Sequence, residues 1–140
     1  MSRSLVVRSE NTYGATILCD HTDTSQGDIG FVLTRNAPED LDDITNAYNI
    51  AIDGFIFKVK DQDAEGSSFK FIGTAGDFNQ LVFTNLKLLN LRMTNTKDCT
   101  GNNIDLAAQC HNLTIDNVKA NYGMYAIYLE NTDGINNNIS

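Results

Sequence analysis

Three nine-residue segments of this chain superpose without a gap, and this internal repeat constrains the fold more than any other feature. The segments are NIAIDGFIF (Asn49 to Phe57), QLVFTNLKL (Gln80 to Leu88) and NLTIDNVKA (Asn112 to Ala120), which start 31 and 32 residues apart. Repeats spaced about 30 residues apart are typical of stacked architectures, in which each unit buries its apolar face against its neighbours. A truncated fourth copy is expected to open at Asn136.

Each copy has the pattern of two short strands joined by a one-residue corner. Apolar residues alternate in the first half, as at Ile50 and Ile52, which is the period of a strand with one buried face. The next apolar residue comes three places later, after Gly or Asn, the residues that most readily adopt the left-handed conformation. We therefore predict a ladder of structural corners at Gly54, Asn85 and Asn117. The residues two places before these corners should form one internal column: Ile52, Phe83 and Ile115.

The whole chain of 140 residues is expected to form a single domain, because no linker composition divides it. Residues 49–140 contain the regular units, and their last unit is expected to be truncated. Residues 1–48 are less regular, with three apolar runs that predict one earlier unit, at residues 5–7, 15–17 and 29–33. Asn36 to Tyr48 predicts one short helix, because Asn36 can cap it, Pro38 suits its first turn and acidic residues follow.

An antiparallel sandwich is the alternative to a stack of repeats. Sandwich strands usually recur every 8 to 12 residues through hairpin turns, and this chain lacks Asn-Gly or Asp-Gly pairs at that rhythm. The aligned copies and their Gly or Asn corners resemble the right-handed parallel β-helix family, the pectate-lyase-like superfamily. The resemblance implies an all-β fold, a right-handed parallel β-helix (β-solenoid) of about three to four coils with the one short helix beside it.

Charge and composition limit the partners of such a chain. Eighteen acidic residues against ten basic ones give a net charge of −8, which disfavours nucleic acid because neutralising phosphates needs Lys and Arg. No apolar run approaches the roughly 20 residues of a membrane span, and no signal-peptide pattern follows Met1, so we expect synthesis in the cytoplasm and no membrane partner. The three cysteines are expected to be reduced and packed.

Two aspartates are the candidates for catalysis. Asp53 and Asp116 occupy the same outward position two copies apart, which places them about 9.6 Å apart if the copies stack at about 4.8 Å. This lies at the edge of the carboxylate separation of about 6.5–9.5 Å in inverting glycosidases. The alternative is that Asp beside a Gly or Asn corner only hydrogen-bonds local backbone. Lys87 and Lys119 also align between copies, as a catalytic lysine, as a sugar-carboxylate contact, or as solvated charges.

An acidic segment matches the first half of a calcium loop. Asp61, Asp63 and Glu65 place oxygen ligands at alternate positions and Gly66 follows as the turn residue, but Ile72 stands where the bidentate Glu belongs. The alternative is an acidic surface loop. No cofactor is therefore expected, with Ca²⁺ at this segment as the one candidate metal.

Two function classes remain open, and the resemblance supplies both. The first is a non-enzymatic structural or attachment protein, such as a component of a phage tailspike or virion. The second is a polysaccharide-processing enzyme, a lyase or glycoside hydrolase, or a fragment of one. The resemblance further implies a homotrimer, virion proteins or a surface polysaccharide as partners, and a place in a virion or on an extracellular surface. The sequence assigns no carbohydrate-binding residue.

Overall fold

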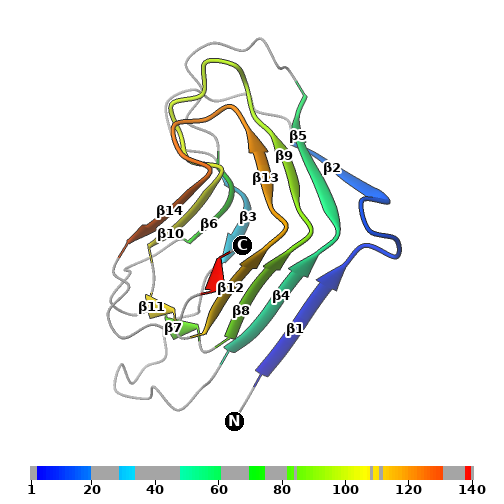
Figure 1. The fold of residues 1–140 in the computed structure, drawn as a ribbon, viewed down its shortest axis with the longest axis vertical. Helices are drawn as coiled ribbons and strands as arrows, with labels where there is room; N and C mark the ends of the chain where they lie inside the picture. The colour runs from blue at the N-terminus through cyan, green and yellow to red at the C-terminus, as the bar shows by residue number, and fades with distance from the viewer. Residues whose placement is uncertain are drawn as a thin grey trace.

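All regular secondary structure that the computed structural model describes in this chain is β-strand. The described residues are 3–19, 29–33, 48–60, 70–74, 82–83, 85–107, 109–110, 112–130 and 138–139. Their strands form three larger sheets and one small one, and every pair of neighbouring strands is parallel (Figure 1). The all-β expectation is confirmed for these residues.

The sheets are named here by their strands. Sheet A contains, in spatial order, β1 (Arg3–Arg8), β4 (Tyr48–Asp53), β8 (Asn85–Leu89), β12 (Leu113–Asp116) and β15 (Asn138–Ile139). Sheet B contains β2 (Ala15–Cys19), β5 (Phe55–Val59), β9 (Arg92–Thr94) and β13 (Lys119–Asn121). Sheet C contains β3 (Ile29–Leu33), β6 (Lys70–Thr74), β10 (Ile104–Ala107) and β14 (Ile127–Glu130). Sheet D pairs β7 (Val82–Phe83) with β11 (Gln109–Cys110).

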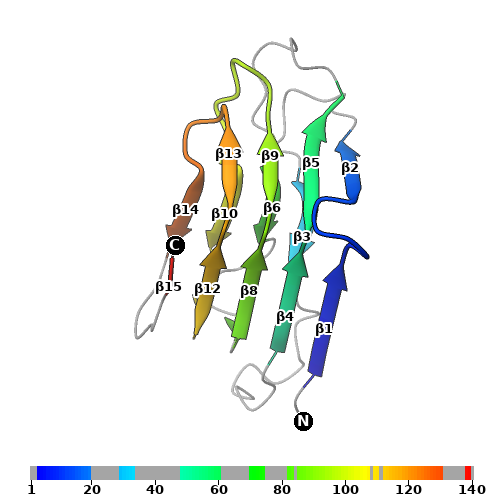
Figure 2. The same cartoon turned by 45° about the vertical axis from the view of Figure 1, so that its right-hand side comes forward.

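Along the chain the strands visit sheets A, B and C in the same order four times. We call each pass a circuit: β1–β2–β3, β4–β5–β6, β8–β9–β10 and β12–β13–β14, after which β15 returns to sheet A. Figure 2 shows the strands of sheet A side by side with those of sheet B above them, and the bend between the two sheets lies at the same level in the second, third and fourth circuits. Each residue therefore lies beside its counterpart in the next circuit.

The core consists of apolar columns that run across the circuits. In sheet A, Leu88 pairs with Ile52 on one side and Ile115 on the other, and all three are at most 1% exposed. In sheet B, Phe57 pairs with Met93. The Phe57 ring lies 5.7 Å from the ring of Phe71, a fully buried residue of β6 in sheet C. The apolar alternation thus produces stacked side chains because the strands pair in register.

The predicted alignment of the second copy is wrong by five residues. Asn49 pairs with Asn85, so Asn85 begins β8 and is not a corner. Phe83 lies in β7 of sheet D, and Leu88 takes its predicted place in the column. Equal spacing of the copies was the misleading feature, because the segments between circuits differ in length.

The corner between sheets A and B is held by Gly54, Asn90 and Asn117. Their φ angles are +86°, +51° and +53°, and each residue lies directly after a sheet A strand. The structure therefore places Gly54 and Asn117 as predicted and puts Asn90 where Asn85 was expected. Gly and Asn tolerate this left-handed conformation, which turns the chain within one residue.

The irregular N-terminal region joins the same three sheets. Its predicted apolar runs are β1, β2 and β3, which pair with β4, β5 and β6 respectively. Residues 36–47 of the predicted helix lie outside the described residues, and Tyr48, its predicted last residue, instead begins β4.

Replacing Asn90 by Val should lower the free energy of unfolding by about 1–3 kcal/mol, because a β-branched residue resists positive φ. Asn85→Val should cost less than about 1 kcal/mol, since Val suits a strand and only the contact with Asn49 is lost. Chemical denaturation measures both. Asn90→Gly is the control: it keeps the left-handed backbone but loses the side-chain hydrogen bonds, so it shows how much of the Asn90→Val effect comes from backbone strain. Equal losses of stability in Asn90→Val and Asn85→Val would contradict the corner assignment.

Candidate functional site

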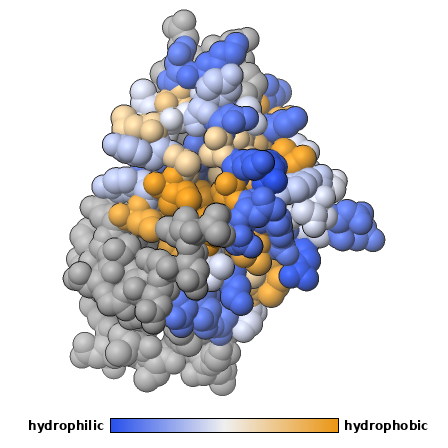
Figure 3. Space-filling model, viewed as in Figure 1, coloured by the Kyte–Doolittle hydropathy of each residue, from blue (hydrophilic) through white to orange (hydrophobic). Residues whose placement is uncertain are grey.

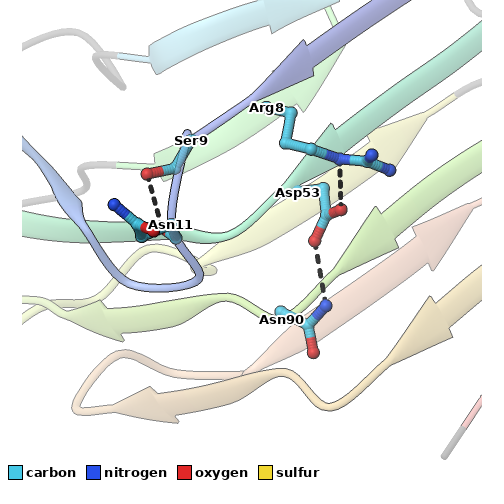
Figure 4. A network of polar contacts seen from close by, with 5 residues as sticks. All are labelled: Arg8, Ser9, Asn11, Asp53 and Asn90. Atoms are coloured by element: carbon cyan, nitrogen blue, oxygen red, sulfur yellow. Dashed lines mark hydrogen bonds and ion pairs between the residues drawn. The ribbon is translucent and has the colours of Figure 1, made fainter.

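Asp53 lies at the centre of a polar network beside the corner. Arg8 Nε donates to Asp53 Oδ2 at 2.8 Å, and Asn90 Nδ2 donates to Asp53 Oδ1 at 2.9 Å (Figure 4). The three residues come from three successive circuits. Both carboxylate oxygens are thereby occupied, and Asp53 is only 9% exposed.

The network continues into the fourth circuit. Asn117 Nδ2 donates to Asn90 Oδ1 at 2.8 Å and to the Tyr13 hydroxyl at 3.1 Å. Arg92 donates to the Asn117 carbonyl oxygen at 2.8 Å, and its guanidinium carbon lies 4.3 Å from the centroid of the Tyr13 ring. Tyr13 thus connects the first circuit to the fourth, with a cation–π contact that strengthens the link.

The two predicted catalytic aspartates share one outward column, as the sequence suggested. Asp53 and Asp116 both pair with Leu89, one on each side, so two strand spacings, about 9.6 Å, separate their backbones. Asp116 is exposed to solvent, and Asp53 is buried and held by Arg8 and Asn90. A carboxylate fixed by two donors suits a structural role, because proton transfer would break bonds that join three circuits.

The calcium candidates Asp61, Asp63 and Glu65 lie outside the described residues. Within the part of the chain that is described, no three His, Cys, Asp or Glu side chains gather closely enough to hold a metal ion. The same described residues include no helix long and apolar enough to cross a membrane.

A second polar cluster lies on the outward side of sheet C. Lys70 Nζ contacts Asp105 Oδ2 at 2.7 Å, and Asn102 Nδ2 donates to the same oxygen at 3.0 Å. The Asp105 side chain is 12% exposed and that of Lys70 29%, so the pair is largely shielded from water. Such shielding strengthens the attraction and fixes both groups in place.

Two exposed tyrosines adjoin this ion pair. Tyr128 pairs directly with Asp105 in the register of β10 and β14, so both side chains lie on the outward face. The rings of Tyr125 and Tyr128 stack, with centroids 6.1 Å apart and planes 29° apart. We call Lys70, Asn102, Asp105, Tyr125 and Tyr128 the sheet C platform.

The sheet C platform was not predicted, although the sequence carries a signal for it. Ile104 and Leu106 alternate like the inward residues of a strand with one buried face, and the same alternation places Asp105 outward between them. Nothing in the sequence brings Lys70 to Asp105, since that contact depends on how far the chain runs between circuits. The stacking of Tyr125 on Tyr128 depends likewise on the turn that precedes β14.

A shallow groove of about 350 Å³ crosses the outward face of sheet A at β1, β4 and β8. One wall is polar, and Asn85 donates to Asn49 within it. The other wall begins with the small apolar residues Val6 and Ala51 and ends at Lys87, which is exposed. The predicted counterpart of this lysine, Lys119, instead lies on sheet B, so the two do not form one column.

No family model, curated protein or solved structure matches this chain. The resemblance to the pectate-lyase-like superfamily therefore stays a proposal that rests on the repeat and on the topology of the strands.

Cys19 and Cys99 are free thiols buried in the described part of the structure, as predicted for both. Burial raises the pKa of the Cys19 thiol from 9.0 to about 11. The unfolded chain therefore ionises first as pH rises, so the stabilisation that the neutral thiol provides is present below pH 9 and lost between pH 9 and 11.

Cys19→Ala should remove this pH dependence. The difference in free energy of unfolding between wild type and variant should be constant below pH 9 and should shrink between pH 9 and 11. Denaturant titrations across this range measure the difference, in which the shared titration of Tyr and Lys cancels. A difference that stays constant up to pH 11 would contradict the burial of this thiol.

Proposed function

We propose that this chain is a right-handed parallel β-helix that acts as a stiff attachment module rather than an enzyme. The topology supports the β-helix: three sheets are visited in a fixed order, all pairs are parallel, and like residues stack in columns. Connections between parallel strands of one sheet are right-handed in nearly all proteins, which supports the proposed hand. Each circuit of such a fold is one coil.

The observation that carries the attachment role is the stacked, exposed pair Tyr125 and Tyr128 beside the Lys70–Asp105 ion pair. Tyr125 is 54% exposed and Tyr128 39%, so the apolar bodies of both rings are open to a ligand. A flat aromatic surface beside hydrogen-bonding groups suits a ligand with one apolar face and a polar rim. We propose a saccharide chain as this ligand.

The chemistry of the sheet C platform favours an uncharged saccharide. Lys70 and Asp105 neutralise one another at 2.7 Å, so the platform presents no net charge. The C–H face of a sugar ring packs on the tyrosine rings, while its hydroxyls donate to Asp105 and accept from Lys70. An acidic saccharide would have to separate Lys70 from Asp105 and leave the shielded carboxylate without its cation.

The alternative, a polysaccharide-processing enzyme, draws on the shared column of Asp53 and Asp116. Both carboxylate oxygens of Asp53 accept hydrogen bonds, from Arg8 and Asn90, which supports a structural role for this residue rather than a catalytic one. A role in a phage tailspike or virion would fit a stiff attachment module, and it rests on the resemblance alone.

Tyr125→Ala and Tyr128→Ala should each weaken binding of a neutral oligosaccharide about tenfold, or ~1.4 kcal/mol, because each removes half of the aromatic surface. The measurement is a panel of neutral and acidic oligosaccharides titrated against wild type and variants. Leu18→Ala is the control, since Leu18 is a comparably exposed apolar residue on sheet B. Equal losses in all three variants, or binding only to acidic saccharides, would contradict the proposed site.

Incubation with the saccharide that binds tests the absence of catalysis. We expect no release of reducing ends and no unsaturated product. Product formation that disappears in Asp53→Asn or Asp116→Asn would replace the attachment role by the enzyme alternative.

A further inference from the structure

We propose that Lys70 and Asn102 join covalently through a side-chain amide (isopeptide) bond, with Asp105 as the carboxylate that moves the protons. The bond links the second circuit to the third, in the middle of the stack. It goes beyond the attachment role, and its chemistry needs no saccharide. Its basis is the meeting of an amine, a carboxamide and a carboxylate at one atom, Asp105 Oδ2.

Asp105 Oδ2 accepts hydrogen bonds from both reacting side chains. Lys70 Nζ lies 2.7 Å from this oxygen and Asn102 Nδ2 lies 3.0 Å from it. Two groups that contact the same oxygen atom are neighbours, so the lysine amine and the asparagine amide are held side by side. Groups held in this way react as if each were highly concentrated, because no encounter in solution is needed.

The backbone holds the two reacting residues together as well. The Asn103 carbonyl oxygen accepts from the N–H groups of Phe71 and Ile72, at 3.0 and 3.2 Å. From there β6 and β10 continue as a parallel pair. Lys70 and Asn102 directly precede these bonded segments, so their side chains start from adjacent stretches of backbone.

Water is largely excluded from the amine and the carboxylate. The Lys70 side chain is 29% exposed and that of Asp105 12%. On the same strands, Ile72 and Ile104 are completely buried, and apolar side chains also gather between β13 and β14 on the fourth circuit (Figure 3). Proton transfer from Lys70 to Asp105 converts two shielded charges into two neutral groups, which such surroundings favour more than water does.

An unpaired oxygen of Asn102 gives this residue a reason to react. Among the described residues, Asn102 Oδ1 is one of the two buried side-chain N or O atoms without a hydrogen-bond partner, which costs free energy. Once Asp105 carries the proton of Lys70, its hydroxyl is a donor, and a half-turn of the Asn102 amide brings Oδ1 to it. The carbonyl group then gains its hydrogen bond and becomes a better electrophile, because the donor stabilises the negative charge that develops on oxygen.

The atoms and electrons of the reaction balance without an oxidant or a cofactor. Lys70 Nζ passes one proton to Asp105 and uses the freed electron pair to form a bond to Asn102 Cγ. The π pair of the carbonyl group moves onto Oδ1 and returns as the bond from Cγ to Nδ2 breaks. Nδ2 leaves as ammonia, with the electron pair of that bond and the proton held by Asp105. Nζ gives a second proton to Asp105, from which the ammonia removes it as ammonium, and keeps the third as the amide N–H.

Asn102 rather than Asp105 is the group that the amine attacks. An ionised carboxylate is a poor electrophile, because its negative charge repels the electron pair of the amine, whereas the carboxamide is uncharged. Ammonia that diffuses away also makes the step irreversible.

The bond is compatible with saccharide binding at the sheet C platform. The new amide N–H of Lys70 donates to a sugar hydroxyl, as the ammonium group does, and Asp105 still accepts. The negative charge that remains on Asp105 disfavours an acidic saccharide. Tyr125 and Tyr128 take no part in the reaction, so the bond and the saccharide site can be tested separately.

Mass spectrometry of the purified, reduced chain tests the bond. The mass should be about 17 Da below that of the sequence, which is the mass of one ammonia. Trypsin does not cleave after an acylated lysine, so the digest should contain peptide 61–87 joined to peptide 98–119. A chain with the full mass of its sequence, or complete cleavage after Lys70, would overturn the bond.

Three variants test the role of each residue, with circular dichroism to verify folding. Lys70→Arg keeps a cation for Asp105 but has no nucleophilic amine, so it should retain its full mass. Asp105→Ala should lower the cross-linked fraction at least about tenfold, because it removes the group that moves the protons. Lys58→Arg, at an exposed lysine of β5, is the matched control and should still lose ammonia.

Two other results would contradict the assigned roles. Loss of ammonia in Lys70→Arg would show that the Asn102 amide reacts with another group, such as its own backbone. A cross-link between Lys70 and Asp105, formed with loss of water, would make the carboxylate the group attacked. No saccharide enters these measurements, so failure of the bond and failure of saccharide binding are distinguishable.

Discussion

Parallel backbone pairing in register is the constraint on which the rest of this structure depends. Strands about 4.8 Å apart oblige each side chain to lie beside its counterpart in the next circuit. Apolar residues such as Ile52, Leu88 and Ile115 therefore stack into a column that excludes water. The same rule forms the outward polar ladders, so both the core and the surface follow from one repeated pairing.

The corner beside sheets A and B preserves this register. A single left-handed residue turns the chain directly after the sheet A strand in three successive circuits, at Gly54, Asn90 and Asn117. The two asparagines also use their side chains to bind the neighbouring circuits, which glycine cannot do. Asn at a corner thus supplies both the backbone conformation and a lateral hydrogen bond, and Tyr13 and Arg92 extend the link to the outer circuits.

The sequence predicted which segments form strands better than it predicted how far apart the equivalent strands of successive circuits lie in the chain. Alternation predicted the strands of the first and third copies and β1, β2 and β3 of the irregular region, because alternation reports which side of a strand is buried. The second copy was misaligned because Leu81/Phe83 and Leu86/Leu88 both alternate, and equal spacing favoured the wrong pair. The segment Asn85–Leu86–Lys87–Leu88–Leu89–Asn90 matches the other copies better once unequal spacing of 36 and 27 residues is accepted. The sheet C platform was missed for a related reason, since Lys70 meets Asp105 only through pairing between circuits.

The acidic charge of the chain lies outside its described strands. These strands contain seven of the ten Lys and Arg residues but only four of the eighteen Asp and Glu, so they carry +3 of a net charge of −8. The four strands of sheet B contain no acidic residue at all. Stacking in register disfavours carboxylates in one column, because they would face each other at about 4.8 Å and repel; in sheet B two cations, Arg92 and Lys119, do pair directly. Asp53 is tolerated in its column because Arg8 pairs with it, and Leu89 separates it from Asp116. The pairing that builds the core therefore also determines which charges the framework can carry.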